Sequence, residues 1–152
     1  MSSLQNFLVW IQLKFRIHSV QNRPLYFKER EVWWCHFGEN VGDEERWKWD
    51  QCMRPVVIMR KFNNNLALVV PTSTVLKENK FYTSFEYGGG TYSALISHLR
   101  TLDTKRLNKK IATLSEDEYT KIHNSIVSEV LKIKIDPSPA EADKGYMANA
   151  NL

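Results

Sequence analysis

Residues 53–74 read MRPVVIMRKFNNNLALVVPTST, and this stretch fixes the expected fold. β-Forming residues fill 55–62 and 66–74, and Asn63–Asn65 between them are of the type that tolerates a positive φ in a turn. We therefore predict a β-hairpin. If its strands are antiparallel, Arg54 and Ser73 lie at the same end of the hairpin.

Further strands are expected on either side of this hairpin. Residues 31–37, 81–87 and 91–96 are rich in β-formers, and Gly88–Gly90 join the last two. Several short strands at close spacing are typical of a small barrel. After Arg100 the chain is expected to turn helical, and Ser115-Glu116-Asp117-Glu118 is a capping box that begins a helix. The predicted buried stripe of that helix is Tyr119, Ile122, Ile126, Val130 and Ile133.

The N-terminal segment has the apolar spacing of a helix. Its apolar positions are Leu4, Phe7, Leu8, Ile11 and Phe15, widened by Trp10, Leu13 and Ile17. We expect this helix to pack on the rest of the protein. The expected organisation is a helical extension at 1–29, a mainly β barrel domain at 30–135 and a disordered tail at 136–152, which has little to bury.

Composition limits the classes of protein that are possible. The 152 residues carry a net charge of +4, which permits polyanionic partners but also suits an ordinary basic globular protein. No basic leader with a cleavage site and no long apolar run is present, so we expect a cytoplasmic protein without a membrane partner. Cys35 and Cys52 form no CxxC pair, which argues against structural zinc and for reduced thiols.

Three polar residues are candidates for chemistry. Arg54 precedes an apolar strand, Glu44 lies in the long polar loop 38–52, and Ser73 ends the neighbouring strand. An arginine, a hydroxyl and a carboxylate at one strand end suit a phosphodiester, because they supply phosphate-oxygen donors and a base. The alternative is that Arg54 is a surface arginine paired with Glu44 or Asp50.

The order of several short segments resembles the PemK/MazF family of type II toxins. These segments are EVWWC at 31–35, GENVGDEE at 38–45, RPVVI at 54–58, VPTST at 70–74, KFY at 80–82 and SHLRTLDTKRL at 97–107. The resemblance runs from about Arg30 to Ile133. It implies an SH3-like barrel of the CcdB/MazF type with a C-terminal helix, usually a homodimer. The N-terminal helix lies outside the minimal family domain.

The resemblance also implies a function. Family members cut single-stranded RNA without a metal or other cofactor, and a cognate antitoxin holds them in check; DNA is bound only through the antitoxin complex, if at all. Arg54 falls on the family's catalytic arginine, Glu44 on the glutamate of its Gly-Ser-Glu-Gln loop, and Ser73 where threonine is more common. We expect the ribose 2′-hydroxyl to attack its own phosphate and leave a cyclic phosphate and a 5′-hydroxyl, with Glu44 as the base.

Other residues are candidates for binding RNA. They are Asp43, Trp47, Lys48, Thr72, Thr74 and His98. Asp43 replaces the family's usual serine and His98 a common glutamine; a lone histidine at a strand end is also often only a satisfied polar residue. Thr72 or Thr74 is an alternative to Ser73 as hydroxyl donor. Trp47, with Trp49, either stacks on bases beside Lys48 or folds inward as a lid.

Two other classes of function stay open. The same barrel serves toxins that inhibit a topoisomerase by binding it, and fold alone does not decide between the classes. A family member that has lost catalysis and only binds a partner protein is the other alternative, and Asp43 and Ser73 are the departures that would mark it.

Overall fold

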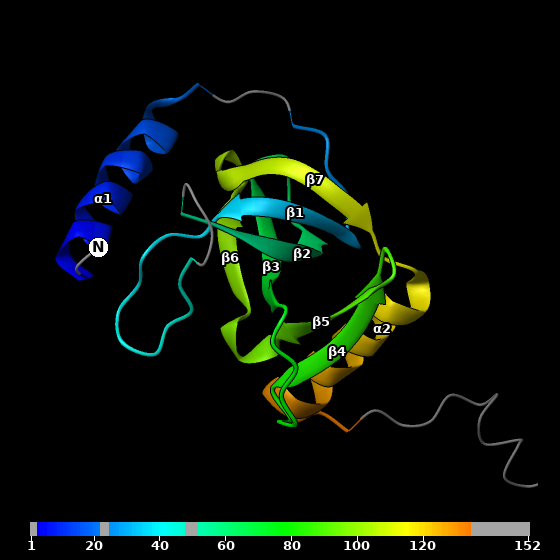
Figure 1. The fold of residues 1–152 in the computed structure, drawn as a ribbon. Coiled ribbons are helices and arrows are strands. Elements are labelled where there is room, and N and C mark those ends of the chain that lie inside the picture. Colours follow the sequence, from blue (N-terminus) through cyan, green and yellow to red (C-terminus); the bar gives the residue numbers. More distant parts are fainter. Residues whose placement is uncertain (1–2, 22–24, 48–51, 135–152) are drawn as a thin grey trace, which may run out of the picture.

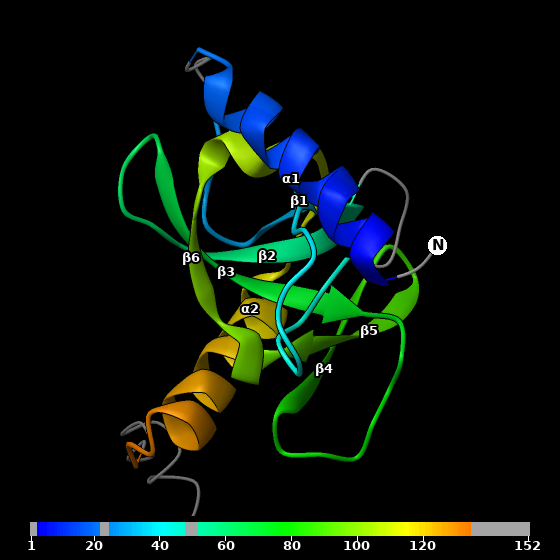
Figure 2. The ribbon, with the colours of Figure 1, turned by 90° about the vertical axis from the view of Figure 1, so that its left-hand side faces the viewer.

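The computed structural model describes residues 3–21, 25–47 and 52–134. Within them, one antiparallel sheet curls around an apolar core and carries a helix at each end of the chain (Figures 1 and 2). The strands are β1 (Glu31–His36), β2 (Met53–Lys61), β3 (Leu66–Ser73), β4 (Tyr82–Tyr87), β5 (Gly90–Leu95), β6 (Arg100–Asp103) and β7 (Leu107–Thr113). The helices are α1 (Ser3–Ser19) and α2 (Glu116–Ser125). The expected mainly β fold with N- and C-terminal helices is confirmed.

The hairpin of β2 and β3 is the centre of the sheet, as predicted. Its register pairs Val56 with Pro71 and Val57 with Val70. β1 and then β7 follow on one side, while β5 and β6 pair with different parts of β3 on the other. Residues 56–59 are all buried because the curled sheet has an apolar cluster on each face. Near the start of β2, Arg54 lies opposite Cys35 of β1 and beside Thr72 of β3.

Helix α2 covers one face of the sheet and begins at the predicted cap. The Ser115 hydroxyl accepts a hydrogen bond from the Glu118 amide at 3.2 Å. Ile122 and Ile126 are buried, and the Tyr119 hydroxyl donates to the Met59 carbonyl at 2.7 Å, which ties the helix to β2. The predicted stripe ends early, because the chain passes into a π-helical turn (Ile126–Val130) and Ile133 is 55% exposed.

The prediction that the chain turns helical after Arg100 is wrong. Two short 3₁₀ turns, Ile96–His98 and Thr104–Arg106, alternate with β6 and β7. β7 pairs with β1 through two irregularities in the register, so its exposed residues 108–110 do not alternate with buried ones. The sequence of β7 therefore lacks the alternation of apolar and polar residues that would indicate a strand.

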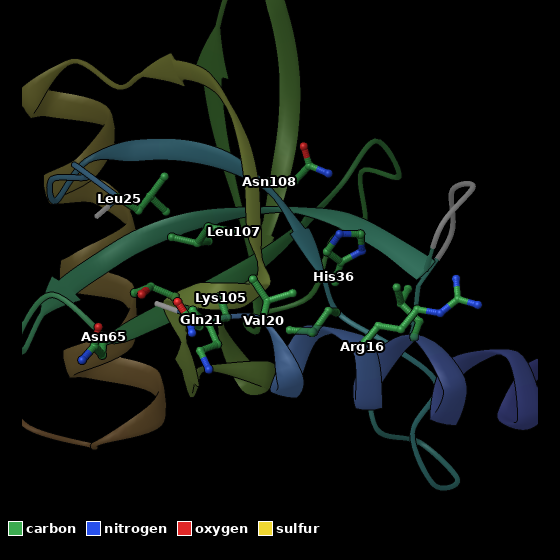
Figure 3. A pocket seen from close by; sticks show the side chains of 12 residues that line it. Arg16, Val20, Gln21, Leu25, His36, Asn65, Lys105, Leu107 and Asn108 are labelled. Carbon is green, nitrogen blue, oxygen red and sulfur yellow. The ribbon is translucent and has the colours of Figure 1, made fainter. Parts of the chain in front are cut away.

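Helix α1 packs on the barrel by a narrower face than the sequence suggests. Trp10 is buried and lies against Gly38, and the Arg106 guanidinium lies over the Trp10 ring at 5.2 Å. The apolar positions of α1 that were expected to pack on the barrel are largely exposed; they are Leu4, Leu8, Ile11 and Phe15. A cavity of about 350 Å³ remains between the C-terminal half of α1 and the barrel (Figure 3).

Two sequence predictions fall wholly or largely beyond the described residues. The tail at 136–152 lies outside them, and so do Lys48, Trp49 and Asp50 of the long loop. No helix among residues 3–21, 25–47 and 52–134 is long and apolar enough to cross a membrane.

Candidate active site

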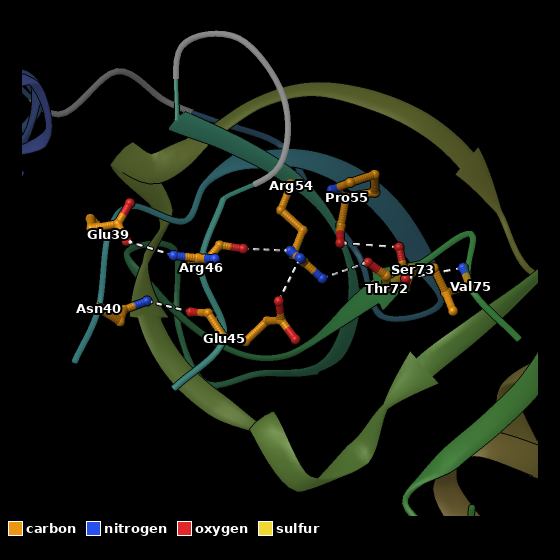
Figure 4. Close-up of polar contacts among 9 residues, drawn as sticks. All are labelled: Glu39, Asn40, Glu45, Arg46, Arg54, Pro55, Thr72, Ser73 and Val75. Atoms are coloured by element: carbon orange, nitrogen blue, oxygen red, sulfur yellow. Dashed lines mark hydrogen bonds and ion pairs between the residues drawn. The ribbon is translucent and has the colours of Figure 1, made fainter. Parts of the chain in front are cut away.

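Arg54 is the second residue of β2, and its guanidinium is buried against the loop that precedes the strand (Figure 4). Nε donates to the Arg46 carbonyl at 2.8 Å, and Nη1 donates to the Thr72 carbonyl at 3.1 Å. Nη2 lies 2.5 Å from Oε1 of Glu45, as an ion pair outside hydrogen-bond geometry. With 1% of its side chain exposed, Arg54 is not the surface arginine that the alternative reading of the sequence described.

The electrostatics of this arginine follow from burial and one carboxylate. Burial lowers the pKa of the Arg54 guanidinium below its ordinary value, while Glu45 and, less strongly, Tyr82 raise it. An arginine stays protonated under such a shift, so the site keeps a fixed positive charge. Glu45, 17% exposed at its side chain, is the charged partner that compensates it.

The loop over Arg54 is held by contacts of its own. Asn40 donates to the Glu45 carbonyl at 2.5 Å, and the Trp47 indole donates to Oε2 of buried Glu39 at 2.7 Å. Arg46 lies 3.7 Å from the same Glu39 carboxylate. Trp47 is therefore tied to its own loop, and whether it stacks on bases or folds inward as a lid stays a prediction.

Glu44 and Glu45 have different environments, although they are adjacent. Glu44 is exposed, and its carboxylate accepts a hydrogen bond from the Val41 amide at 3.1 Å. The carboxylate that contacts Arg54 is that of Glu45. Sequence reasoning placed Glu44 at the site and missed Glu45, because neither charge nor spacing distinguishes two neighbouring carboxylates.

A pocket of about 230 Å³ gathers several of the candidate residues. Glu44 and His98 both line it, together with Glu45 and Arg100. The Arg100 guanidinium lies over the Phe37 ring at 5.1 Å, which orients it. Two carboxylates, an imidazole and a guanidinium thus share one hollow, so proton transfer and phosphate binding can occur side by side. Arg100 was missed as a site residue although it lies in the same segment as His98.

The hydroxyl residues lie on the other side of Arg54. Thr72 Oγ1 donates to the Pro55 carbonyl at 3.2 Å, and Ser73 Oγ accepts a hydrogen bond from the Val75 amide at 3.1 Å. Thr74 is exposed. All three line a second pocket, of about 180 Å³, that also includes Arg54. The antiparallel hairpin therefore brings Arg54 and Ser73 to the same end, as predicted.

Asp43 and the two cysteines lie outside the two pockets beside Arg54. Asp43 is exposed on the loop. Cys35 and Cys52 are free and buried, and burial raises the pKa of the Cys35 thiol to about 12, which makes it inert. Among the described residues, no group of three or more His, Cys, Asp or Glu side chains is placed to hold a metal ion.

Comparison with protein families gives a match over most of the barrel. Residues 28–130 match the family described as PemK-like, MazF-like toxin of type II toxin-antitoxin system. The chain belongs to this family. The match includes the Arg54 site, the two pockets beside it and α2, whereas the whole of α1 precedes it. No curated protein sequence matches the chain.

Solved structures share the fold of this PemK/MazF family member at low sequence identity. MazF from Deinococcus radiodurans has a TM-score of 0.60 at 19% identity, over 72% of this chain and 99% of that one. An endoribonuclease in complex with its cognate antitoxin, from Mycobacterial species, has a TM-score of 0.52 at 12% identity, over 71% and 97%. Toxin MazF-mt6 from Mycobacterium tuberculosis has the same two values, over 70% and 100%. These likenesses show a MazF-like fold.

Proposed function

We propose that the protein is the toxin of a type II toxin–antitoxin system and cuts single-stranded RNA at the Arg54 site. The observation that carries this proposal is the burial of Arg54, which forms an ion pair with Glu45. Glu45 in turn lines a pocket that contains side chains able to transfer protons, Glu44 and His98. Family membership supports the same reaction class, and one fold neighbour is named an endoribonuclease.

In the proposed reaction, the substrate phosphate replaces the Glu45 carboxylate at Nη2 of Arg54. Both are anionic oxygen ligands, and a guanidinium binds either through the same donors. The hydrogen bonds from Nε and Nη1 to two backbone carbonyls hold the guanidinium in place during the exchange. The described conformation is then the resting state, in which Glu45 occupies the phosphate position.

Glu44 is the proposed base. Glu44 is exposed and lines the same pocket as Glu45, so its carboxylate is accessible to a ribose hydroxyl near the phosphate. It removes the 2′-hydroxyl proton, the 2′-oxygen attacks phosphorus, and the bond to the 5′-oxygen breaks. Arg54 and Ser73 stabilise the charge on the phosphate oxygens, and His98, which lines the same pocket as Glu44, protonates the leaving oxygen. The products are a cyclic phosphate and a 5′-hydroxyl.

The proposed partners follow from the family. A cognate antitoxin binds this chain and blocks the site; one fold neighbour was solved in complex with its cognate antitoxin. We further propose that the toxin acts in the cytoplasm as a homodimer.

The test compares wild type with Arg54→Ala in a bacterial host and in vitro. Wild type should arrest growth and fragment RNA, and the purified protein should cut single-stranded RNA in EDTA to give the products above. Arg54→Ala should reduce the cleavage rate about 10²- to 10³-fold, as loss of a transition-state donor does.

Other outcomes would identify the alternative functions. Growth arrest with intact RNA would point to inhibition by protein binding, as in the topoisomerase class. Absence of arrest would indicate a member without catalysis, and cleavage that requires an added divalent metal would overturn the proposed mechanism.

A further inference from the structure

The pocket that Arg54 shares with the hydroxyl residues has an aromatic wall. Trp34, Tyr87 and Tyr92, all half-buried, line it together with Arg54, Thr72 and Ser73. The rings of Tyr87 and Tyr92 are stacked with centroids 4.4 Å apart and planes inclined by 19°. Fully buried Phe85 lies behind both, at 6.0 Å from each ring. The two tyrosines are therefore held in place before any ligand enters.

The chemistry of the pocket suits a nucleotide. Among the described residues that line it, Arg54 is the only charged side chain, so an anion is favoured at that end and neutral rings elsewhere. Thr72 Oγ1 donates to the Pro55 carbonyl but keeps lone pairs that accept from an N–H group. Unpaired RNA bases are commonly recognised by stacking on aromatic side chains combined with hydrogen bonds to their edges.

We propose that this pocket takes one unpaired base of the RNA, next to the cleaved phosphate, and sets the base preference of the toxin. The inference rests on the proposed function, because it places the phosphate at Arg54. The base then enters on the side of Trp34, Tyr87 and Tyr92, while the ribose hydroxyl meets Glu44 on the opposite side of the Arg54–Glu45 pair.

Charge favours RNA over an apolar side chain of a protein partner in this pocket. An apolar side chain makes no use of the Arg54 guanidinium, whereas every nucleotide carries a phosphate that can accept hydrogen bonds from it. Tyr82 is close enough to Arg54 to affect its pKa, and exposed Lys77 lies over the Tyr82 ring at 5.3 Å.

The experiment measures the base preference of cleavage in a pool of random single-stranded RNA, by sequencing the new 5′ ends. Tyr92→Leu and Trp34→Leu should flatten the preference at one position beside the cut and leave the other positions unchanged. The matched control is Tyr26→Leu, since Tyr26 is 77% exposed and lies outside the pocket. Thermal unfolding of each variant establishes that it is folded.

A second measurement separates this inference from the proposed cleavage. Short homopolymers of the four bases in 2′-O-methyl RNA cannot be cut, so they report binding alone. Wild type should prefer one of them, and Tyr92→Leu should weaken that complex about 5- to 150-fold, the range for loss of base–aromatic stacking. Unchanged preference and affinity in both pocket variants would overturn the inference and leave the pocket to a side chain of the antitoxin. If the protein cuts no RNA but still prefers one homopolymer, and Tyr92→Leu still weakens that complex, only the proposed nuclease activity would be overturned.

Discussion

Arg54 and Glu45 form an ion pair whose two members line different pockets. Glu45 lines the pocket with Glu44, His98 and Arg100, and Arg54 lines the pocket with the hydroxyl and aromatic residues. The contact is 2.5 Å long and joins a buried guanidinium to a carboxylate that is still partly exposed. Under the proposed function, a strand of RNA would place the sugar in one pocket and the base in the other.

Glu44→Gln and Glu45→Gln should have opposite effects on cleavage. Glu44→Gln removes the proposed base and should lower kcat about 10²- to 10⁴-fold. Glu45→Gln removes the anion that competes with phosphate for Arg54, so KM for RNA should fall while cleavage is retained. Steady-state cleavage of one labelled RNA gives both constants.

The stability of these two variants should differ as well. Glu45→Gln leaves the buried charge of Arg54 without its counter-ion, which should lower the free energy of unfolding by about 1–3 kcal/mol. Glu44→Gln should change it little, because the Glu44 carboxylate is exposed. A large loss of kcat in Glu45→Gln alone would assign the base to Glu45 instead.

Arg54→Lys should impair the site although it keeps the charge. A lysine cannot donate to the Arg46 and Thr72 carbonyls in the geometry of Nε and Nη1 while also meeting Glu45. We expect a loss of about 1–3 kcal/mol in the free energy of unfolding, since a buried acceptor is left unsatisfied. Arg60→Lys is the control: Arg60 is paired with Glu29 at 3.4 Å but is 66% exposed, so its replacement should cost less than about 0.5 kcal/mol in urea unfolding. Equal losses in the two variants would contradict a structural role for the Arg54 hydrogen bonds.

The sequence predicts the central hairpin well because its signals are local. Two β-forming segments flank Asn63–Asn65, so the order of the chain brings Arg54 to the end of the hairpin that carries Ser73. The exact register also depends on an irregularity between Ile58 and Arg60. The capping box at Ser115 is likewise complete within four residues. Such features need no knowledge of the rest of the chain.

Features that depend on long-range packing were not predictable in the same way. The choice of Glu45 over Glu44 depends on how Asn40 and Glu39 fold the loop over Arg54. The strand β7 forms because β1 is available to pair with it, despite two irregularities. Trp10 faces the barrel because Gly38 leaves space for its ring, and Gly38 is distant in sequence.

Gly38→Ala should loosen α1 from the barrel. Gly38 has φ of +86°, and a Cβ there would lie 2.1 Å from Cε2 of Trp10. The substitution therefore adds displacement of a buried tryptophan to the backbone strain of a positive φ, which alone costs about 1–2 kcal/mol. Amide hydrogen exchange should become faster throughout α1, and the free energy of unfolding should fall.

A second glycine isolates the strain from the clash. Gly89 has φ of +78° but no atom within 4 Å of the position of a Cβ. Gly89→Ala should thus show the backbone cost alone and leave exchange in α1 unchanged. The same exchange rates in α1 for both alanine variants would show that Trp10 does not depend on the space at Gly38.

Glu31→Gln should make the stability of the protein less sensitive to acid. Burial raises the pKa of Glu31, but contacts with Lys110 at 2.7 Å, the Lys28 amide and the Trp33 indole outweigh it, and the net pKa lies below its ordinary value of 4.5.

Because the unfolded chain takes up this proton more readily, the carboxylate stabilises the fold above about pH 4.5 and loses that contribution as pH falls through the lowered pKa. Urea unfolding at pH 7 and pH 3 should show a smaller drop in the free energy of unfolding for Glu31→Gln than for wild type, together with a lower value at pH 7. Equal drops in the two proteins would show that other carboxylates carry the acid sensitivity, and that the link between β1 and β7 through Lys110 does not depend on the charge of Glu31.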